Sequence, residues 1–152
     1  TCRIGVSKRE PAKLHVFAGK QMTAGKPFLD DVRLRDRMSH VEIELMALEI
    51  TNLRFLDQMR RSGQPPGADV SMLKIKGTEI QQELTELMMD AVGPFALPNL
   101  PMAWGDHWIG AHVGPDYAAP LAARYFNYRK TTIYGGSNEI QRNIITKAVL
   151  GL

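Results

Sequence analysis

The stretch IYGGSNEIQRNIITKAVLGL, residues 133–152, combines residue types that can hold a ligand. Gly135 and Gly136 allow a close approach to the backbone, and Ser137 and Asn138 follow them at the start of an apolar-periodic run. A helix that begins here places free N–H groups and the positive end of its dipole beside the glycines, which stabilises an anionic or electron-rich ligand. Glycine is also the ordinary residue of a tight turn. The pattern therefore predicts either a ligand contact or a simple turn.

Other candidate side chains form no recognisable catalytic or metal-binding motif. His107 and His112, with Asp106 beside them, have a spacing that does not place both histidines on one face of a helix, so we predict no metal site. No nucleophile-elbow sequence accompanies the serines. The carboxylates of the longest apolar-periodic segment have no visible partner for acid–base work; they are Glu42, Glu44 and Glu49.

Length and composition describe one ordinary globular domain, with 152 residues of which 44% are hydrophobic and 23% charged. The net charge of +3 comes from interleaved basic and acidic residues, which disfavours nucleic acid as a partner. No apolar run approaches the ~20 residues of a membrane span. We therefore expect no membrane association. The single cysteine, Cys2, cannot form an internal disulfide, which is typical of a reducing compartment, so we expect a cytoplasmic location. Because Thr1 stands where an initiator Met is usual, we expect a fragment.

The longest helix is predicted around residues 34–59. Apolar residues recur there at spacings of three and four, which marks one face of a helix. They are Leu34, Met38, Val41, Leu45, Leu48, Phe55 and Met59. Asp30 or Asp31 is a suitable N-cap, and the turn formers of residues 62–67 end the helix. We interpret the methionines of this helix and the next as core filling; they are Met38, Met46, Met59, Met72, Met88 and Met89.

A second long helix is predicted to follow the first. The same spacing continues through Leu73, Ile80, Leu84, Leu87 and Ala91. Asp69 or Ser71 is its expected N-cap, and Gly93-Pro94 stops it. A long loop over residues 94–116, with a helical turn at 105–110, then leads to the remaining helices.

Shorter helices complete the pattern. One is predicted over residues 8–22, where Pro11 starts or kinks it, and another from Pro120 to about Lys130. The last begins near Ser137, with either Ser137 or a capping box of Asn138 and Gln141 at its start. No β-alternation is present. The predicted fold class is therefore all-α, an antiparallel helical bundle with a four-helix-bundle core plus a C-terminal helix.

Residues 133–152 closely resemble the terminal helix signature of the acyl-CoA dehydrogenase family, whose members read I-Y-x-G-[TS]-x-x-I-Q-R there. Residues 25–49 and 71–93 also look like the corresponding helices of bacterial members. The resemblance covers essentially the whole chain, 1–152, as the C-terminal helical domain, with the N-terminal and middle domains absent. It implies an FAD enzyme that removes an α-proton and a β-hydride from an acyl-CoA thioester. In this family the domain also builds the oligomer and contributes to the FAD site of a neighbouring subunit.

The resemblance implies roles for particular residues. The segment that matches the substrate-binding backbone at the thioester end of acyl-CoA is Tyr134, Gly135 and Gly136. The positions that match cofactor-binding residues of the family are Thr23, Ser137 and Glu139. Ser137 matches a hydroxyl that contacts the flavin, and Glu139 matches a residue near the adenosine end of FAD. The resemblance implies no metal.

The chain also departs from the family pattern. Gly135 occupies a position at which many members carry the catalytic glutamate, so no catalytic residue is expected in this chain. The base is expected just upstream of Thr1, and the chain alone is expected to be inactive. Gln21 and Ala24 replace the Arg and Phe of the family's R-x-T-F-G cofactor motif, and Gly93-Pro94 lies where a Q-x-x-G-G loop touches the FAD pyrophosphate. Loss of the arginine–phosphate contact removes a strong charge-assisted hydrogen bond.

Two functions remain open. The first is an FAD-dependent acyl-CoA dehydrogenase, to which this domain contributes part of the pocket and the oligomer contacts. The second is a non-catalytic structural subunit of a hetero-oligomer, whose paralogous partner supplies FAD and the base. The intact signature from Tyr134 to Arg142 favours the first, and the departures favour the second. The expected partners are an acyl-CoA and either further copies of the chain, as a dimer or tetramer through the bundle, or a paralogue.

Overall fold

The computed structural model of the chain describes residues 3–100 and 109–151. It confirms the predicted all-α fold class, because helices account for nearly all the regular structure that is described. The α-helices are α1 (Ile4–Ser7), α2 (Glu10–Lys20), α3 (Val32–Ser62), α4 (Ser71–Val92), α5 (Ala119–Tyr128) and α6 (Asn138–Val149). Short 3-10 helices cover η1 (Phe28–Asp30), η2 (Ala68–Val70), η3 (Gly93–Ala96) and η5 (Arg129–Thr132). A small antiparallel hairpin pairs β1 (Met22–Thr23) with β2 (Lys26–Pro27).

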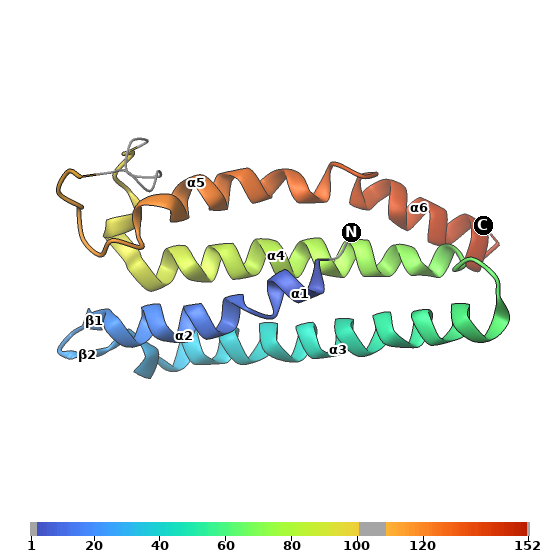
Figure 1. The fold of residues 1–152 in the computed structure, drawn as a ribbon, viewed down its shortest axis with the longest axis horizontal. Helices are drawn as coiled ribbons and strands as arrows, with labels where there is room; N and C mark the ends of the chain where they lie inside the picture. The colour runs from blue at the N-terminus through green and yellow to red at the C-terminus, as the bar shows by residue number, and fades with distance from the viewer. Residues whose placement is uncertain (1–2, 101–108, 152) are drawn as a thin grey trace.

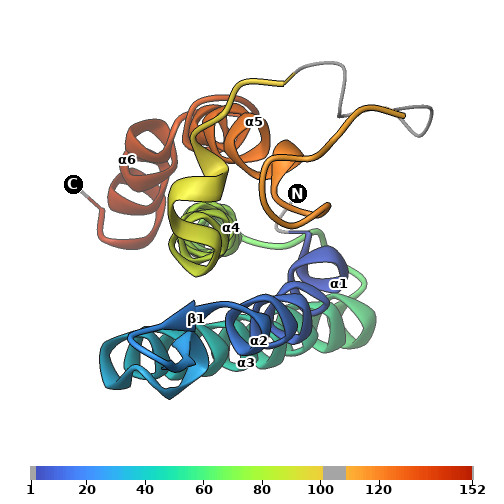
Figure 2. The ribbon, with the colours of Figure 1, turned by 90° about the vertical axis from the view of Figure 1, so that its left-hand side faces the viewer.

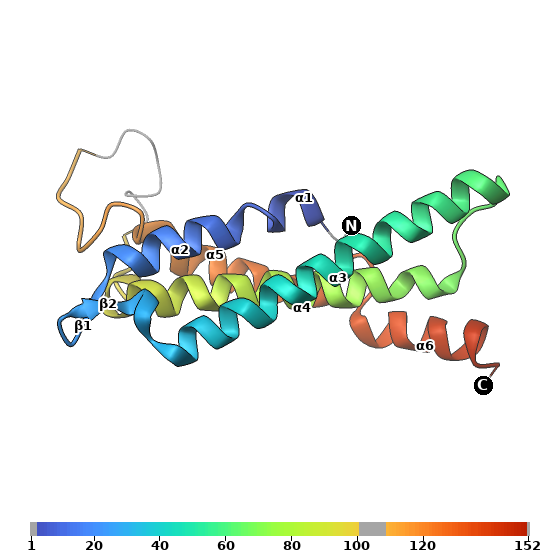
Figure 3. The same cartoon turned by 90° about the horizontal axis from the view of Figure 1, so that it is seen from below.

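Helix α4 is the central element of the bundle. It packs against α2 and α3 on one side and against α5 and α6 on the other (Figure 2). Helices α5 and α6 follow one another along α4, so together they form one interrupted leg of the bundle (Figure 1). The view in Figure 3 shows that α3 extends along the full length of the molecule. The buried hydrophobic residues of α2, α3, α4 and α5 form one core cluster, whereas the one buried residue of α6 is the polar Asn138.

The sequence of α3 explains where this helix begins and which face it buries. The Asp31 carboxylate accepts hydrogen bonds from the backbone N–H groups of Arg33, at 2.9 Å, and Leu34, at 3.1 Å, so Asp31 rather than Asp30 is the N-cap. Such a cap stabilises a helix by about 1 kcal/mol. Gly63, with φ of 67°, ends the helix in the left-handed conformation. The predicted inner stripe is confirmed as far as Leu48, whereas Phe55 and Met59 are only partly buried; its buried members are Leu34, Met38, Val41, Leu45 and Leu48.

The start of α4 differs from the prediction. Residue Val70 stands at the N-cap position and no side chain caps the helix. The 3-10 turn η2 leads directly into α4, so Asp69 lies inside that turn and Ser71 is already the first helical residue. The predicted cap at Asp69 or Ser71 is therefore wrong. The predicted end of the helix is confirmed, because α4 stops at Gly93.

The amino-terminal part also differs in detail from the prediction. The helix expected over residues 8–22 is shorter, since α2 begins at Glu10 with Pro11 in its first turn and ends at Lys20. The short helix α1 before it and the hairpin after it were not predicted. The hairpin pairs Met22 with Pro27 through a turn that contains Gly25. The helical turn predicted at 105–110 lies mostly outside the described residues.

The methionine interpretation is correct for part of the set. Met38 and Met88 are buried in the core, but Met46 and Met72 are 66% and 40% exposed, so core filling is wrong for those two. Met46 belongs to an outer face of α3, opposite the buried stripe. We call this set the α3 outer face; its exposed members are Ile43, Met46, Ile50 and Leu53. Their spacing of mostly three and four residues is the pattern of a helix seam that packs against another helix.

A buried ion pair joins the amino-terminal helix α2 to α5. The guanidinium of Arg124 donates to the carboxylate of Glu10 at 2.7 Å, and Lys13 lies 3.3 Å from the same carboxyl group. Burial alone would raise the pKa of Glu10, but the hydrogen bond and charge of Arg124, with help from Lys13, hold the pKa below its ordinary value. The folded state therefore favours ionised Glu10. This stabilisation is present above the unfolded-state pKa and is lost as pH falls through the lowered folded-state pKa.

We expect Glu10→Gln to lower the free energy of unfolding by about 3 kcal/mol at pH 7, because Arg124 is left without its partner. The difference between variant and wild type should decrease as pH falls through the lowered folded-state pKa of Glu10, because Glu10 itself then becomes protonated. Urea unfolding of both proteins at pH 7 and pH 3 measures this. The control is Glu42→Gln, whose half-exposed pair with His15 should contribute under about 0.5 kcal/mol. A Glu10→Gln loss that is equal at pH 3 and pH 7 would contradict the assignment.

Candidate functional site

The glycine pair lies in the loop that interrupts the α5–α6 leg. The loop leaves η5 at Thr132, and the backbone N–H groups of Ile133 and Tyr134 donate to the carbonyl of Lys130. Gly135 and Gly136 then adopt φ of 69° and 86°, in the left-handed region that glycine tolerates best. The chain thus turns from one helix into the next without a side chain at the turn.

Ser137 is the N-cap of α6. Its hydroxyl accepts a hydrogen bond from the backbone N–H of Ile140 at 3.4 Å. The alternative capping box of Asn138 and Gln141 is wrong, because Asn138 is the first helical residue and its buried side chain bonds Lys74 of α4. Glu139 is exposed, and its pKa is lowered by the hydrogen bond from its own backbone N–H and then by the Ser137 hydroxyl. A carboxylate therefore stands at the positive end of α6, where the dipole favours negative charge.

The space beside the loop is open at Gly135. A Cβ atom added at Gly135 would meet no heavy atom within 4 Å, whereas one at Gly136 would come 2.5 Å from the Gln141 side-chain nitrogen. A cavity of about 320 Å³ adjoins this point, and its lining residues are Arg3, Lys74, Thr78, Thr131, Tyr134 and Gly135. Tyr134 is 51% exposed, so the loop also faces the outside. Of the two glycines, Gly135 therefore has open space where a side chain would stand, and Gly136 does not.

The amino end of the described chain lies beside the same loop. Arg3 lines the cavity together with Tyr134 and Gly135, and Figure 1 shows the start of the chain at mid-length of the bundle.

Lys74 is a buried cation at this site that the sequence pattern did not predict. The Lys74 side chain is only 7% exposed, and its ammonium donates to the carbonyl of Thr132 at 3.1 Å and to the side-chain oxygen of Asn138 at 2.8 Å. Burial lowers the pKa of Lys74, and the negative charge of Glu139 opposes this shift.

A signal for Lys74 was present in the sequence. Polar residues recur along α4 at alternating spacings of three and four, and all are buried; they are Ser71, Lys74, Thr78, Gln81 and Thr85. A polar stripe at helical spacing ordinarily marks a solvated face. Here it lies under the α5–α6 leg, where Lys74, Thr78 and Thr85 contact polar groups of that leg.

The other predicted cofactor residue, Thr23, lies elsewhere. It is exposed on β1, in the hairpin at one end of the bundle, whereas Ser137 and Glu139 lie at the α5–α6 junction (Figure 1). The departures from the family pattern gather at the hairpin end too, because Gln21 and Ala24 flank β1 and α4 ends at Gly93 beside it. One chain therefore does not bring the predicted FAD contacts together.

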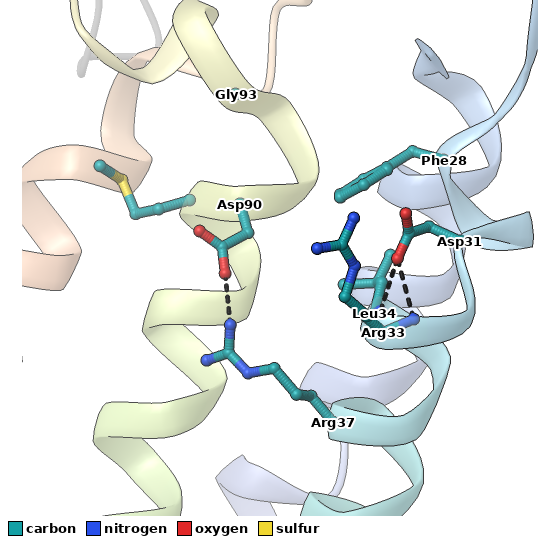
Figure 4. Close-up of a pocket in the computed structure, with 8 residues that line it drawn as sticks. Phe28, Asp31, Arg33, Leu34, Arg37, Asp90 and Gly93 are labelled. Atoms are coloured by element: carbon teal, nitrogen blue, oxygen red, sulfur yellow. Dashed lines mark hydrogen bonds and ion pairs between the residues drawn. The ribbon is translucent and has the colours of Figure 1, made fainter. Parts of the chain in front are cut away.

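A pocket of about 520 Å³ lies at the hairpin end, between the start of α3 and the end of α4 (Figure 4). Its lining residues are Phe28, Asp31, Arg33, Leu34, Arg37, Met89, Asp90 and Gly93. Arg37 donates to the carboxylates of Glu83, Glu86 and Asp90 at 2.7–3.0 Å. Burial would lower the pKa of Arg37, but its bonds to Glu83 and Asp90 raise it. Its charge is thus already neutralised within the chain.

The residues of the chain fit FAD at one end and not at the other. At the α5–α6 junction, Gly135 leaves open space, and the Ser137 hydroxyl two residues later caps α6. At the hairpin end, Gln21 replaces the family arginine and donates to the Tyr117 hydroxyl at 2.8 Å. Of the pocket's arginines, only Arg33 has no ion pair with the described residues. The surface beside this pocket is therefore poor in available positive charge.

Metal and membrane sites receive no support from the described part of the chain. Residues 3–100 and 109–151 contain no group of three or more side chains able to hold a metal ion. His112 is exposed, whereas Asp106 and His107 lie outside the described residues. Within the same ranges, the helices are too polar or too short to cross a bilayer.

Comparison with known proteins gives a consistent result. Residues 2–150 match the family described as acyl-CoA dehydrogenase, C-terminal domain. Over 125 residues the chain is 34% identical to acyl-CoA dehydrogenase IpdE1 of Mycobacterium tuberculosis, an alignment that covers 81% of this chain and 28% of that protein.

Solved structures share the fold. The FAD complex of PigA matches with a TM-score of 0.74 and 19% identity, over 98% of this chain and 34% of that one. The ChsE4–ChsE5 complex from Mycobacterium tuberculosis matches with a TM-score of 0.72 and 23% identity, over 98% and 36%. The chain thus spans about a third or less of the proteins it resembles. It belongs to the acyl-CoA dehydrogenase family and corresponds to the C-terminal helical domain of that family.

Proposed function

We propose that this chain, residues 1–152, is the C-terminal domain of a longer FAD-dependent acyl-CoA dehydrogenase whose N-terminal and middle domains lie outside it. The observation that carries the proposal is the open space at Gly135, inside a domain of this family and beside a cavity. Because glycine has no side chain, the backbone at this point leaves room for the thioester end of an acyl-CoA. The reaction would be α,β-dehydrogenation of that thioester.

Each residue of the loop has a defined role in this proposal. Tyr134, Gly135 and Gly136 shape the pocket for the thioester, and Ser137 offers its hydroxyl to the flavin. FAD, when bound, supplies the acceptor for the β-hydride. Glu139 contacts FAD near its adenosine end, and Thr23 contacts FAD through the cofactor motif. Because these two residues lie far apart in one chain, we propose that each FAD is bound by residues of two subunits.

The α-proton base is proposed to lie upstream of Thr1. Gly135 has no side chain, and the lining residues of the cavity include no carboxylate among those described. Since Arg3 lines the cavity, a carboxylate a few residues before it would be close to Gly135. A base in such a site is effective when desolvation brings its pKa near the working pH. The 152-residue chain without that base should be inactive.

Assembly through the bundle follows from the α3 outer face. Ile43, Met46, Ile50 and Leu53 are each more than 50% exposed, and exposed apolar patches of this kind mark interaction sites. We propose that this face packs against another subunit, either a second copy of the protein or a paralogue.

A second candidate function is that of a structural subunit, whose paralogous partner supplies FAD and the base. The hairpin end favours it, because Gln21 is engaged by Tyr117 and Arg37 is paired with carboxylates. The likeness to the ChsE4–ChsE5 complex, whose name describes two different subunits, is consistent with a partner of this kind.

The absorption spectrum of the purified full-length protein tests the two candidates. For the dehydrogenase, we expect a bound flavin band that an acyl-CoA bleaches under anaerobic conditions. A colourless protein that becomes yellow only when a paralogue is co-expressed would support the structural subunit instead. A protein that acquires no flavin in either case would remove both candidates.

A further inference from the structure

The glycine loop is held against α4 at both of its ends by one side chain. The ammonium of Lys74 donates to the carbonyl of Thr132, just before the loop, at 3.1 Å, and to the side chain of Asn138, just after it, at 2.8 Å. The Thr78 hydroxyl lies 3.3 Å from the same Asn138 oxygen. The five residues between these two anchor points include Tyr134, Gly135 and Gly136.

The loop itself has little to fix its conformation. Two adjacent glycines lose more backbone entropy on ordering than any other pair of residues, and Gly135 meets no neighbour where a Cβ would be. Ile133, Tyr134 and both glycines are exposed in the described chain. Two other α4 side chains reach this region, but each acts on one side only: Thr78 bonds Asn138 after the loop, and Gln82 bonds mostly to η5 ahead of it. The bonds of Lys74 are therefore the ones that close the loop on both sides.

Burial of a lysine is unfavourable unless its ammonium is well bonded. Lys74 is 7% exposed, and its bonded acceptors are a neutral carbonyl and a neutral amide rather than a carboxylate. An apolar residue would fill this place in a core with less loss of hydration. What the lysine adds, and an apolar residue lacks, is the connection between Thr132 and Asn138.

We propose that Lys74 is a positioning residue, which holds the Tyr134–Gly136 backbone in the conformation that lines the cavity. The proposal rests on the proposed function only where it calls this loop the substrate segment. Lys74 acts through the loop and is not assigned a contact with acyl-CoA or flavin.

The test compares Lys74→Met with Lys76→Met in the full-length protein. Lys76 is a matched control, since it lies two positions along the same helix and its exposed ammonium pairs with Glu44 and Glu79. Amide hydrogen exchange is followed in peptides that cover residues 132–141 and α3. In Lys74→Met we expect the loop peptide to exchange at least about tenfold faster than in wild type, with α3 unchanged. In Lys76→Met we expect both peptides to exchange as in wild type.

The kinetic readout uses the flavin-loaded protein, alone or with its paralogue. Lys74→Met should lower kcat/KM for an acyl-CoA about 100-fold, because small displacements of positioning groups have effects of this size. Lys76→Met should stay within about twofold of wild type. Faster exchange in the loop and α3 together would indicate a general loss of structure and overturn the proposal. Unchanged exchange in the loop would overturn it as well.

A second variant, Asn138→Ala, keeps the test decisive if Lys74→Met does not fold. Asn138→Ala removes the acceptor after the loop and leaves Lys74 in place, and it should also accelerate exchange in the loop alone. If Lys74→Met does not fold, the outcome with Asn138→Ala decides. If the wild-type protein shows no activity with any acyl-CoA, the proposed function fails, but the exchange comparison still decides the role of Lys74.

Discussion

Gly135→Ala is expected to lower kcat/KM of the intact enzyme for its acyl-CoA about 100-fold, whereas Gly63→Ala should change it by less than about threefold. The added methyl group at Gly135 would stand in the open space beside the cavity, which the proposed function assigns to the thioester. Gly63 ends α3, at the end of the bundle opposite the hairpin (Figure 1).

The two glycines both have a left-handed backbone conformation and have the same free space for an added Cβ atom. Their φ values are 69° and 67°, and a Cβ would meet no heavy atom within 4 Å at either position. Alanine in the left-handed region costs roughly 1–2 kcal/mol at both. If both variants lose the same stability, a larger loss of kcat/KM in Gly135→Ala can therefore be attributed to the pocket.

Steady-state kinetics and thermal unfolding of both variants provide the measurement. We expect the two melting temperatures to fall by similar amounts. If kcat/KM also falls equally in both variants, the space at Gly135 is not the substrate pocket and the proposed function loses its main support.

Ile50→Glu is expected to dissociate the assembled protein. Ile50 lies in the middle of the α3 outer face and is 57% exposed in the single chain. In an assembly that covers this face, the new carboxylate would be buried without a partner, at a cost of several kcal/mol. Association should weaken by at least about 100-fold, which at micromolar concentration leaves separate subunits.

Sedimentation of the full-length protein measures this effect. The control is Val16→Glu on α2, which introduces the same charge at an apolar residue of similar exposure, 52%. We expect the control to sediment as the wild type does. A wild-type protein that sediments as a single subunit, or an Ile50→Glu variant that stays assembled, would show that the α3 outer face is not the interface.

The helices were predictable from the sequence because their apolar spacing reflects a core that the chain itself provides. The inner stripe of α3, from Leu34 to Leu48, is an example. The start of α4 could not be predicted from the sequence. Asp69 belongs to the preceding 3-10 turn, and a shift of one residue is enough to move a side chain out of the N-cap position. The short hairpin at Met22 to Pro27 has too few residues for an alternating pattern to be visible.

The candidate site was predictable where glycine marks an unusual backbone, as at Gly135. It was not predictable where a polar residue is buried by a segment far away in sequence. Lys74 and Asn138 are 64 positions apart, and nothing local shows that they meet. A lysine on a helix is ordinarily solvated, so only the recurrence of polar residues along α4 distinguished this one.

The interruption between α5 and α6 has a consequence for what a helical bundle can present at its flank. In an unbroken helix of the same length, every backbone N–H beyond the first turn would donate to a carbonyl of the same helix. By stopping one helix at mid-length and starting another, the protein places a helix start halfway along its flank, where the Ser137 hydroxyl accepts the N–H of Ile140 and the Glu139 carboxylate accepts its own N–H. The break thus gives the flank of the bundle a stretch of glycine backbone and two capping side chains, which an unbroken helix could not place there.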